Sequence, residues 1–283
     1  MTAWLLGHAG PTRLLVVATL LVLLLAWQRL RPRRGDAALP GRRWRNIALV
    51  LVSSAAVYVL VPVTTVAFAA AMTAAGSGLF NSGVINRVAL PSALGMLLGI
   101  VLLDLAIYWQ HRWFHRLPWL WRIHRVHHSD IGFDATLGLR FHPAEILLSL
   151  LYKLALIRVF GFAPMTVLVY EILLASFALF THADIALPAC WDARLRRLFV
   201  TPDWHRVHHS VYRDETDSNY GNLLSAWDRL FASHVPQPRD GHIGMRIGLP
   251  GFRDPAAQTI FALLRQPLAS DPHVSSTRQS PDA

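Results

Sequence analysis

Long runs of apolar residues recur along the N-terminal part of the chain. Three of these runs have the length and composition of helices that cross a bilayer: residues 14–27, 47–72 and 91–110. Two further runs, 144–160 and 163–181, are separated by Gly161 and Pro164 and predict a helical hairpin that dips into the membrane and returns. The pattern therefore predicts an all-α integral membrane bundle of four to five spans.

The segments between and after these runs are polar. The loop at 73–90 is rich in Gly, Ser and Asn, and Pro62 is expected to kink the long second run. Residues 191–250 are polar, aromatic and irregular, so we expect a cap over the helix ends, and residues 268–283 have the composition of a disordered end. We divide the chain into three parts: an N-terminal span with its following loop (1–45), a membrane domain (46–250) and a tail (251–283).

Arginines are concentrated directly after the first apolar run. Only Arg13 precedes that run, whereas seven follow it in a short segment: Arg29, Arg31, Arg33, Arg34, Arg42, Arg43 and Arg45. By the positive-inside rule this segment is cytoplasmic, so the first run is an uncleaved signal anchor with its N-terminus outside. Counting the later spans places residues 111–142 and 182–209 on the cytoplasmic side, which in a bacterium would be that of the inner membrane.

The composition argues against several other classes of function. With 53% hydrophobic residues the chain belongs to the membrane class, and its formal charge of +10 comes from arginines beside apolar runs, which favours lipid headgroups over nucleic acid. A basic cap would also attract an acidic electron-transfer protein. The single cysteine, Cys190, excludes an internal disulfide and a thiolate cluster, so a metal would be bound through nitrogen or oxygen.

Eight of the fourteen histidines fall into three short motifs, HRWFH at 111–115 and HRVHH at both 124–128 and 205–209. Histidines three or four residues apart share one face of a helix and can bind one metal together. The neighbours His127 and His128 point about 100° apart, so each could serve a different ion. Imidazole suits zinc, copper, iron and nickel, but eight or more histidines suffice for two ions with open positions, which favours dioxygen chemistry over hydrolysis.

Several other polar residues have a place in this interpretation. His182 follows the hairpin and is expected to be a ligand, whereas His142 before Pro143 could be a ligand, an outer-shell residue or a helix cap. Asp104, seven residues before His111, is expected to accept the second ring proton of a ligand histidine, the alternative being a salt bridge to an arginine. Similar outer-shell roles are open to Asp203 and Asp228, and four histidines are not expected to be ligands: His8, His234, His242 and His273.

The HxxxH, HxxHH and HxxHH motifs on a hydrophobic chain resemble those of the fatty acid hydroxylase and sterol desaturase superfamily of membrane di-iron enzymes. Further similar stretches extend the resemblance over about residues 92–235: Asp104 with Tyr108, GLRFHPAE at 138–145, TPDWHRVHHS at 201–210 and NYGNLLSAWDRLF at 219–231. Two stretches depart from the usual pattern, at His182-Ala183-Asp184 and Phe231-Ala232-Ser233.

The resemblance implies a di-iron oxidoreductase domain within residues 46–250, with Tyr108 at the site. Such enzymes use dioxygen to hydroxylate or desaturate a sterol, fatty acyl chain or related lipid. Carried over residue by residue, the iron ligands would be His111, His115, His124, His127, His128, His182, His205, His208 and His209. The sequence has neither a haem-binding His-Pro-Gly-Gly segment nor a dinucleotide fingerprint, so electrons are expected from a separate donor protein.

Two rival functions stay open at this point. A zinc-dependent membrane hydrolase would need fewer ligands and a general base, for which Glu145 is the candidate. A metal carrier would need polar residues distributed through the spans, where Asp104 stands alone in its run. The sequence also leaves open which lipid is oxidised and whether the reaction is hydroxylation or desaturation.

Overall fold

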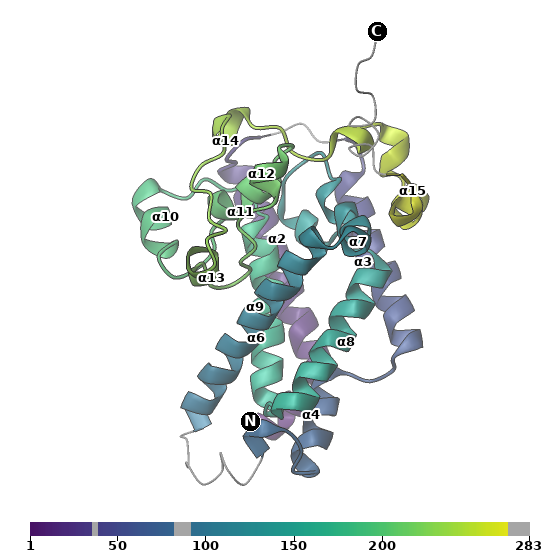
Figure 1. Ribbon diagram of the computed structural model, residues 1–283, viewed down its shortest axis with the longest axis vertical. Helices are drawn as coiled ribbons and strands as arrows, with labels where there is room; N and C mark the ends of the chain where they lie inside the picture. Colours follow the sequence, from purple (N-terminus) through teal and green to yellow (C-terminus); the bar gives the residue numbers. More distant parts are fainter. Residues whose placement is uncertain (36–38, 82–91, 271–283) are drawn as a thin grey trace, which may run out of the picture.

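A bundle of long helices stands beneath a cap of short ones (Figure 1). The computed structural model describes residues 1–35, 39–81 and 92–270. In these ranges the regular structure is helical apart from three isolated β-bridges, which confirms the all-α prediction. Half of the predicted loop 73–90 and most of the predicted disordered end 268–283 lie outside the described residues.

The N-terminal helices run from the far end of the bundle to the cap (Figure 1). After the short α1 (Thr2–Gly7), α2 (Ala9–Leu30) is longer than the predicted first span and reaches the cap. Its residue Leu24 is buried against Leu179 and Ile185, at the cap end of the bundle. The chain therefore enters the Arg-rich segment on the side of the molecule that carries the cap.

The second predicted span is two helices in the structure, α3 (Arg42–Leu60) and α4 (Thr65–Ala74), followed by the short η1 (Leu79–Asn81). The break lies at Pro62, whose ring disfavours the helical conformation of the preceding residue; Val61 has φ −137° and ψ 81°. Thr64 then starts α4 by accepting a hydrogen bond from the backbone N–H of Ala67 at 3.1 Å. Proline thus breaks this span, where the sequence predicted only a kink.

The central helices form the frame of the histidine region. They are α6 (Ser92–Arg116), α7 (Pro118–His128), η2 (Ala135–Leu139), α8 (Pro143–Phe160) and α9 (Pro164–Thr181). Pro118 cannot continue α6, so the chain turns at Leu117 and α7 starts in a new direction. Gly161 ends α8 with a left-handed φ of 70°, and Pro164 begins α9, which confirms the predicted hairpin.

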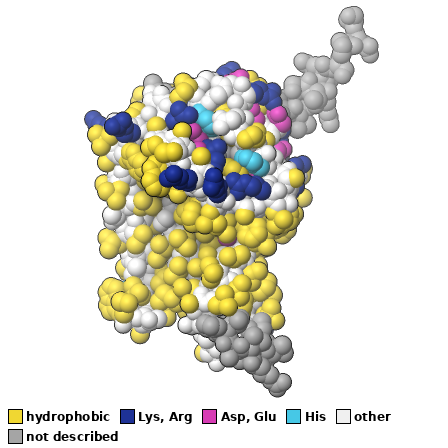
Figure 2. Space-filling view, turned by 90° about the vertical axis from the view of Figure 1, so that its left-hand side faces the viewer, with side chains coloured by type: hydrophobic (Ala, Val, Ile, Leu, Met, Phe, Trp, Pro, Cys, Tyr) yellow, Lys and Arg dark blue, Asp and Glu magenta, His cyan; other side chains and the backbone are white. Residues whose placement is uncertain are grey.

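In the part of the chain that the structure describes, four helical segments have the length and hydropathy of membrane spans: Ala9–Leu30, Arg42–Asn81, Ser92–Arg116 and Pro164–Thr181. Hydrophobic side chains cover the visible face of the bundle, and Lys and Arg side chains gather at its border with the cap (Figure 2). Three exposed tryptophans lie at this end of the molecule, namely Trp44 at the start of α3, Trp113 near the end of α6 and Trp191 in α10. An apolar belt bordered by Trp and Arg is the surface of a multi-pass membrane protein.

The cap is irregular, as predicted. It contains α10 (Ala189–Leu195), α11 (Pro202–His208), α12 (Arg213–Thr216), α13 (Ala226–Leu230), α14 (Gly241–Gly244), η3 (Pro250–Phe252), η4 (Pro255–Gln258), α15 (Ile260–Arg265) and η5 (Gln266–Leu268). The last of these elements pack on α7: Leu263 is fully buried beside Val126, and Arg125 donates to the carbonyl of Gln266 at 2.7 Å. The division of the chain at residue 250 stays a prediction.

The Arg-rich segment is folded onto the cap. Arg33 forms a two-pronged contact with Asp203, and Arg42 pairs with the buried acids Asp130 and Asp134. Arg34 donates through its side chain to two cap carbonyls and through its backbone to Asp184. Arg33 and Arg34 therefore attach this segment to the cap, and Arg42 attaches it to the loop between α7 and η2.

Candidate metal centre

Nine histidines meet in two adjacent groups where the bundle joins the cap. Within each group, one ring nitrogen per residue lies within 4.8 Å of all the others. Group 1 consists of His111, His115, His124, His128 and His208, and group 2 of His127, His182, His205 and His209. The structure thus brings together all nine residues that the family resemblance implied as ligands.

The two HRVHH motifs contribute to both groups in opposite proportions. In α7, His124 and His128 belong to group 1 and His127 to group 2. Around α11 the division is reversed, because His205 and His209 belong to group 2 and His208 to group 1. The adjacent residues of each pair lie in different groups because neighbouring side chains on a helix point about 100° apart.

The spacing of the ring nitrogens fits metal coordination. Pairs of Nε2 atoms within a group lie 3.0–3.2 Å apart, namely His127–His182, His182–His209, His182–His205, His124–His128 and His111–His208. Two ligands of one ion at about 2.1 Å would be about 3.0 Å apart at a right angle and about 3.4 Å apart at the tetrahedral angle. Lone pairs facing each other at this distance would repel, so each group is suited to a cation at its centre.

Burial disfavours the charged form of six of these histidines. The pKa of His182 falls to about 4, mainly through burial. Five further histidines have a pKa well below the ordinary value, mainly because of burial and secondly because of the neighbouring imidazoles: His127, His128, His205, His208 and His209. A neutral ring keeps the nitrogen lone pair that a metal requires.

Group 1 is oriented by hydrogen bonds to the Nδ1 atoms of its rings. His111 donates from Nδ1 to the backbone carbonyl of Tyr220 at 2.7 Å. His208 donates from Nδ1 to the backbone carbonyl of Ser218 at 2.6 Å. Nδ1 of His124 lies 2.7 Å from Oε1 of Glu145, and Nδ1 of His115 lies 3.3 Å from Oδ1 of Asp217. An acceptor on the outer nitrogen fixes the tautomer and turns Nε2 inward.

Group 2 is held mainly by aromatic packing. His182 donates from Nδ1 to the carbonyl of Ala178 at 2.6 Å. The His127 ring instead stacks on Phe141, with centroids 4.7 Å apart and planes at 8°. His209 packs edge to face on Phe133 at 5.6 Å, and among the described residues Nδ1 of His127 and of His209 has no hydrogen-bond partner. The two groups therefore differ in what orients their rings.

Asp104 does not make the contact expected of it. Its Oδ2 accepts hydrogen bonds from the Trp227 indole at 2.8 Å and the Leu224 backbone N–H at 3.1 Å, and no described histidine donates to it. The alternative salt bridge to an arginine is also not found among the described residues. The buried carboxylate joins α6 to the cap segment that follows Tyr220, because that segment supplies donors nearer than the histidines.

Other expected site residues lie outside the two groups. The Tyr108 hydroxyl is 2.8 Å from Ser233 Oγ, and its buried ring stacks on Phe231, so it packs α6 against the cap. His142 is the N-cap of α8, with Nδ1 accepting from the Ala144 N–H at 3.1 Å. Of the three roles left open for His142, the structure places it in the capping role.

Asp203 and Asp228 do not contact a ligand histidine in the described part of the chain. Asp203 pairs with Arg33 and Arg206. Asp228 accepts from the backbone N–H of Tyr220 at 2.8 Å and from the Trp204 indole at 3.2 Å, so it fixes the segment whose carbonyl orients His111. Three of the histidines not expected to be ligands lie outside both groups, namely His8, His234 and His242, and His273 lies outside the described residues.

Sequence reasoning missed most of the groups that orient the rings. The carbonyls of Tyr220, Ser218 and Ala178 are backbone atoms and have no signature in the sequence. Glu145 was considered only as the base of a hydrolase. Its position in the GLRFHPAE stretch, one helical turn into α8, was the available signal for a role near the second histidine motif.

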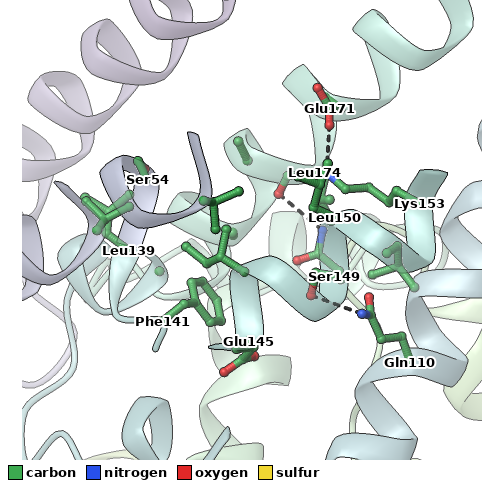
Figure 3. Close-up of a pocket in the computed structure, with 18 of the residues that line it drawn as sticks. Ser54, Gln110, Leu139, Phe141, Glu145, Ser149, Leu150, Lys153, Glu171 and Leu174 are labelled. Atoms are coloured by element: carbon green, nitrogen blue, oxygen red, sulfur yellow. Dashed lines mark hydrogen bonds and ion pairs between the residues drawn. The ribbon is translucent and has the colours of Figure 1, made fainter. Parts of the chain in front are cut away.

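A cavity of about 650 Å³ extends from the two groups into the membrane bundle. His111, His124, His127, His182 and His205 line its inner end. Its walls are mainly aliphatic and aromatic, and come from α3, α6, α8 and α9 (Figure 3). Its size and apolar walls fit a lipid chain with one end at the histidines.

Comparison with known proteins finds a matching family model and several relatives. The family model described as "Fatty acid hydroxylase" matches residues 96–233. The ornithine lipid hydroxylase OlsE of Rhizobium tropici is 31% identical over 180 residues, which cover 63% of this chain and 52% of that protein. The human alkylglycerol monooxygenase is 30% identical over 46% of this chain and 28% of its own length. The rat cholesterol 25-hydroxylase is 23% identical over 49% of this chain and 46% of its own length.

The chain spans about half or less of the length of these curated relatives. The residues that match the family model contain all three histidine motifs. No solved structure matches the chain significantly. Residues 96–233, which carry both histidine groups, therefore match the fatty acid hydroxylase family, in agreement with the resemblance of the histidine motifs.

Proposed function

We propose that this protein is a membrane oxidoreductase that hydroxylates or desaturates a lipid at a di-iron centre bound by the nine histidines of groups 1 and 2. The observation that carries the proposal is the opening of two adjacent imidazole groups onto one apolar cavity between membrane helices. The relatives named for oxidising ornithine lipid, alkylglycerol and cholesterol support the same type of reaction here.

The number of donors supports two redox-active ions. Group 1 offers five imidazoles and group 2 offers four, whereas a single zinc ion uses three or four protein ligands. Iron accepts imidazole ligands readily, and a bound iron pair would activate dioxygen for abstraction of hydrogen from an unactivated C–H bond. The acceptors on the outer ring nitrogens would hold the histidines in their ligand tautomer.

The cavity would bind and orient the substrate. Its apolar walls exclude water from the end lined by the histidines and offer dispersion contacts along a lipid chain. Among its few polar lining groups, Gln110 and Ser149 hydrogen-bond each other at 3.0 Å, and Oε1 of Glu145 accepts from His124 at 2.7 Å. The position of the oxidised carbon would then be set by how far the chain extends towards the histidines.

We place the histidine end of the bundle on the cytoplasmic side, and we propose that a separate protein supplies the electrons. The Arg-rich segment packs on this same end, and such segments stay cytoplasmic. The basic border of the cap would attract an acidic donor protein (Figure 2). Reduction in isolated membranes should therefore require an added donor.

The rival functions find less support. A zinc hydrolase would use Glu145 as its base, but Oε1 of this residue accepts the hydrogen bond from His124 at 2.7 Å, a role that orients a ligand. A carrier would need a polar route through the spans, whereas the cavity that reaches the histidines has mainly apolar walls.

Mössbauer spectroscopy tests the proposal on membranes of cells grown with iron-57 that overproduce the chain. Measuring membranes avoids replacement of iron by zinc during purification. About two coupled ferric ions per chain, absent from membranes with a His127→Ala variant, are expected. Intact protein without iron, or lipid turnover under strict anaerobiosis, would overturn the proposal in favour of hydrolytic or transport chemistry.

A further inference from the structure

Three charged side chains meet on the cavity wall away from the histidines. Nζ of Lys153 lies 2.6 Å from one Glu171 oxygen, and NH1 of Arg13 lies 2.7 Å from the other. Glu171 is 6% exposed, Lys153 17% and Arg13 47%. Two cations share one carboxylate, so this part of the cavity carries one unbalanced positive charge. Charges in membrane-spanning segments are costly and are functional candidates by default.

The ammonium group of Lys153 has capacity for a further partner. Both oxygens of Glu171 are engaged, and the Arg13 guanidinium already balances its charge. A lysine ammonium has three N–H donors, and in the described part of the chain that of Lys153 uses one, towards Glu171. The side chain lines the cavity, so its remaining donors can serve a molecule bound there.

The charged group and the histidines lie at opposite ends of the cavity. Figure 3 shows Glu145 at one end and Lys153 with Glu171 at the other. Lys153 follows Glu145 by eight residues on α8, which corresponds to about 12 Å along the helix. Glu171 precedes His182 by eleven residues, or about 16 Å along α9. A molecule held at Lys153 would therefore place a carbon about 12–16 Å away beside the histidines.

The broken second span opens the cavity near this charged group. Tyr58, Val61, Val63 and Thr64 line the cavity around the α3–α4 break, and Tyr58 is 74% exposed. Arg13 lines the same region. A lipid could thus enter sideways from the bilayer and bring its polar end to Lys153 without passing the histidines.

From this arrangement we propose that Lys153 determines specificity by binding the anionic end of a long-chain lipid, a carboxylate or a phosphate, whose apolar chain extends to the histidines. Glu171 and Arg13 hold the ammonium in position. A neutral sterol or alcohol would leave the net positive charge of these three side chains unbalanced in an apolar cavity and would bind less well. The identity of the oxidised lipid rests on the proposed function, whereas the binding preference does not.

Binding of a fluorescent lipid tests this inference without iron or oxygen. The full chain in phosphatidylcholine nanodiscs is titrated with cis-parinaric acid or with its methyl ester, against empty nanodiscs. The wild type should bind the acid at least about tenfold more tightly than the ester, because a charge-assisted contact is lost with the ester. Lys153→Gln should remove this preference and Lys153→Arg should keep it. Arg158→Gln, which removes a cation from the same helix outside the cavity, is the matched control and should keep the preference.

Competition then identifies the anionic group. Displacement by oleate alone would indicate a carboxylate, and displacement by oleoyl lysophosphatidate would indicate a phosphate end. Equal binding of acid and ester by the wild type, or a preference that survives in Lys153→Gln, would overturn the inference. If the chain holds no iron but still prefers the acid to the ester through Lys153, the proposed function would be wrong and this inference would stand.

Discussion

The two histidine groups are built from the same residue type but are held in different ways. In group 1, four of the five rings have an oxygen acceptor on Nδ1, two from backbone carbonyls and two from the carboxylates of Glu145 and Asp217. In group 2, His182 has a carbonyl acceptor, whereas His127 and His209 are positioned against Phe141 and Phe133. Hydrogen bonds fix the direction of a lone pair, whereas ring packing leaves rotation in the ring plane less restricted.

This difference has a chemical consequence for the two ions. A carboxylate on the outer nitrogen raises the basicity of the imidazole, so an ion in group 1 should be bound more tightly and more rigidly. An ion in group 2 should tolerate changes of geometry more easily. Four predictions test this contrast, and they are taken in order of decreasing effect.

Removal of a ligand from either group should have the largest effect. His127→Ala and His128→Ala alter adjacent residues, one from each group. Because loss of an outer-shell partner alone costs about 10- to 100-fold, loss of a ligand should lower lipid oxidation by more than about 100-fold while membrane insertion is retained. His8→Ala, an exposed histidine in the N-terminal part, should be unaffected in the same lipid assay. If His127→Ala kept its activity, group 2 would not be part of the catalytic metal centre.

Glu145→Gln should have the next largest effect, and it acts on group 1. The substitution replaces the carboxylate that accepts from His124 with a neutral acceptor of the same size. Iron affinity in a chelator competition should fall by about 10- to 100-fold. Since Glu145 also lines the cavity, binding of the fluorescent lipid is measured in parallel and should change little. Unchanged iron affinity would show that hydrogen bonding does not strengthen group 1.

Gly138→Ala should weaken group 2 through the backbone. A Cβ at this position would lie 2.3 Å from the carbonyl oxygen of Ala178, the acceptor for His182. The clash should cost about 1–3 kcal/mol of unfolding free energy and lower activity by about tenfold. Thermal unfolding in detergent measures the first effect. Gly95→Ala, where a Cβ has no atom within 4 Å, is the control and should lower neither quantity, because alanine favours the helix more than glycine does.

Phe141→Leu should have the smallest effect of the four. It removes the ring on which His127 stacks, an interaction worth about 0.5–1.5 kcal/mol, while keeping an apolar side chain. A loss of a few-fold in iron affinity is expected, measured by the same chelator competition as for Glu145→Gln. If the two substitutions weakened iron binding equally, the contrast between the groups would be wrong.

The sequence predicted the spans, the hairpin and the nine converging histidines, because each depends on residue type and spacing. Asp104 shows where such reasoning stops. Helical spacing put it on the face of His111, but its hydrogen bonds come from Leu224 and Trp227, more than a hundred residues later. Periodicity gives the direction of a side chain, whereas its partner depends on how distant segments pack.

The arginines and the proline teach the same lesson. The Arg-rich segment predicted which end of the bundle carries the cap, but not that Arg33 would pair with Asp203 or Arg42 with Asp130. Pro62 predicted a disturbance of the second span, but whether the helix bends or ends depends on the packing of α4 against α8 and α9. Local chemistry indicated where the helix changes, and tertiary contacts determined how.

The interleaving of the two HRVHH motifs links the two ion sites thermodynamically. Since α7 and the α11 region each supply ligands to both groups, neither site can be completed while either segment is loose. Binding of a first ion would order both segments and reduce the conformational entropy lost when the second binds. Binding of the two ions should therefore be positively cooperative. When the apoprotein is titrated with metal, most molecules should hold either no ion or two, and molecules with one ion should be scarce.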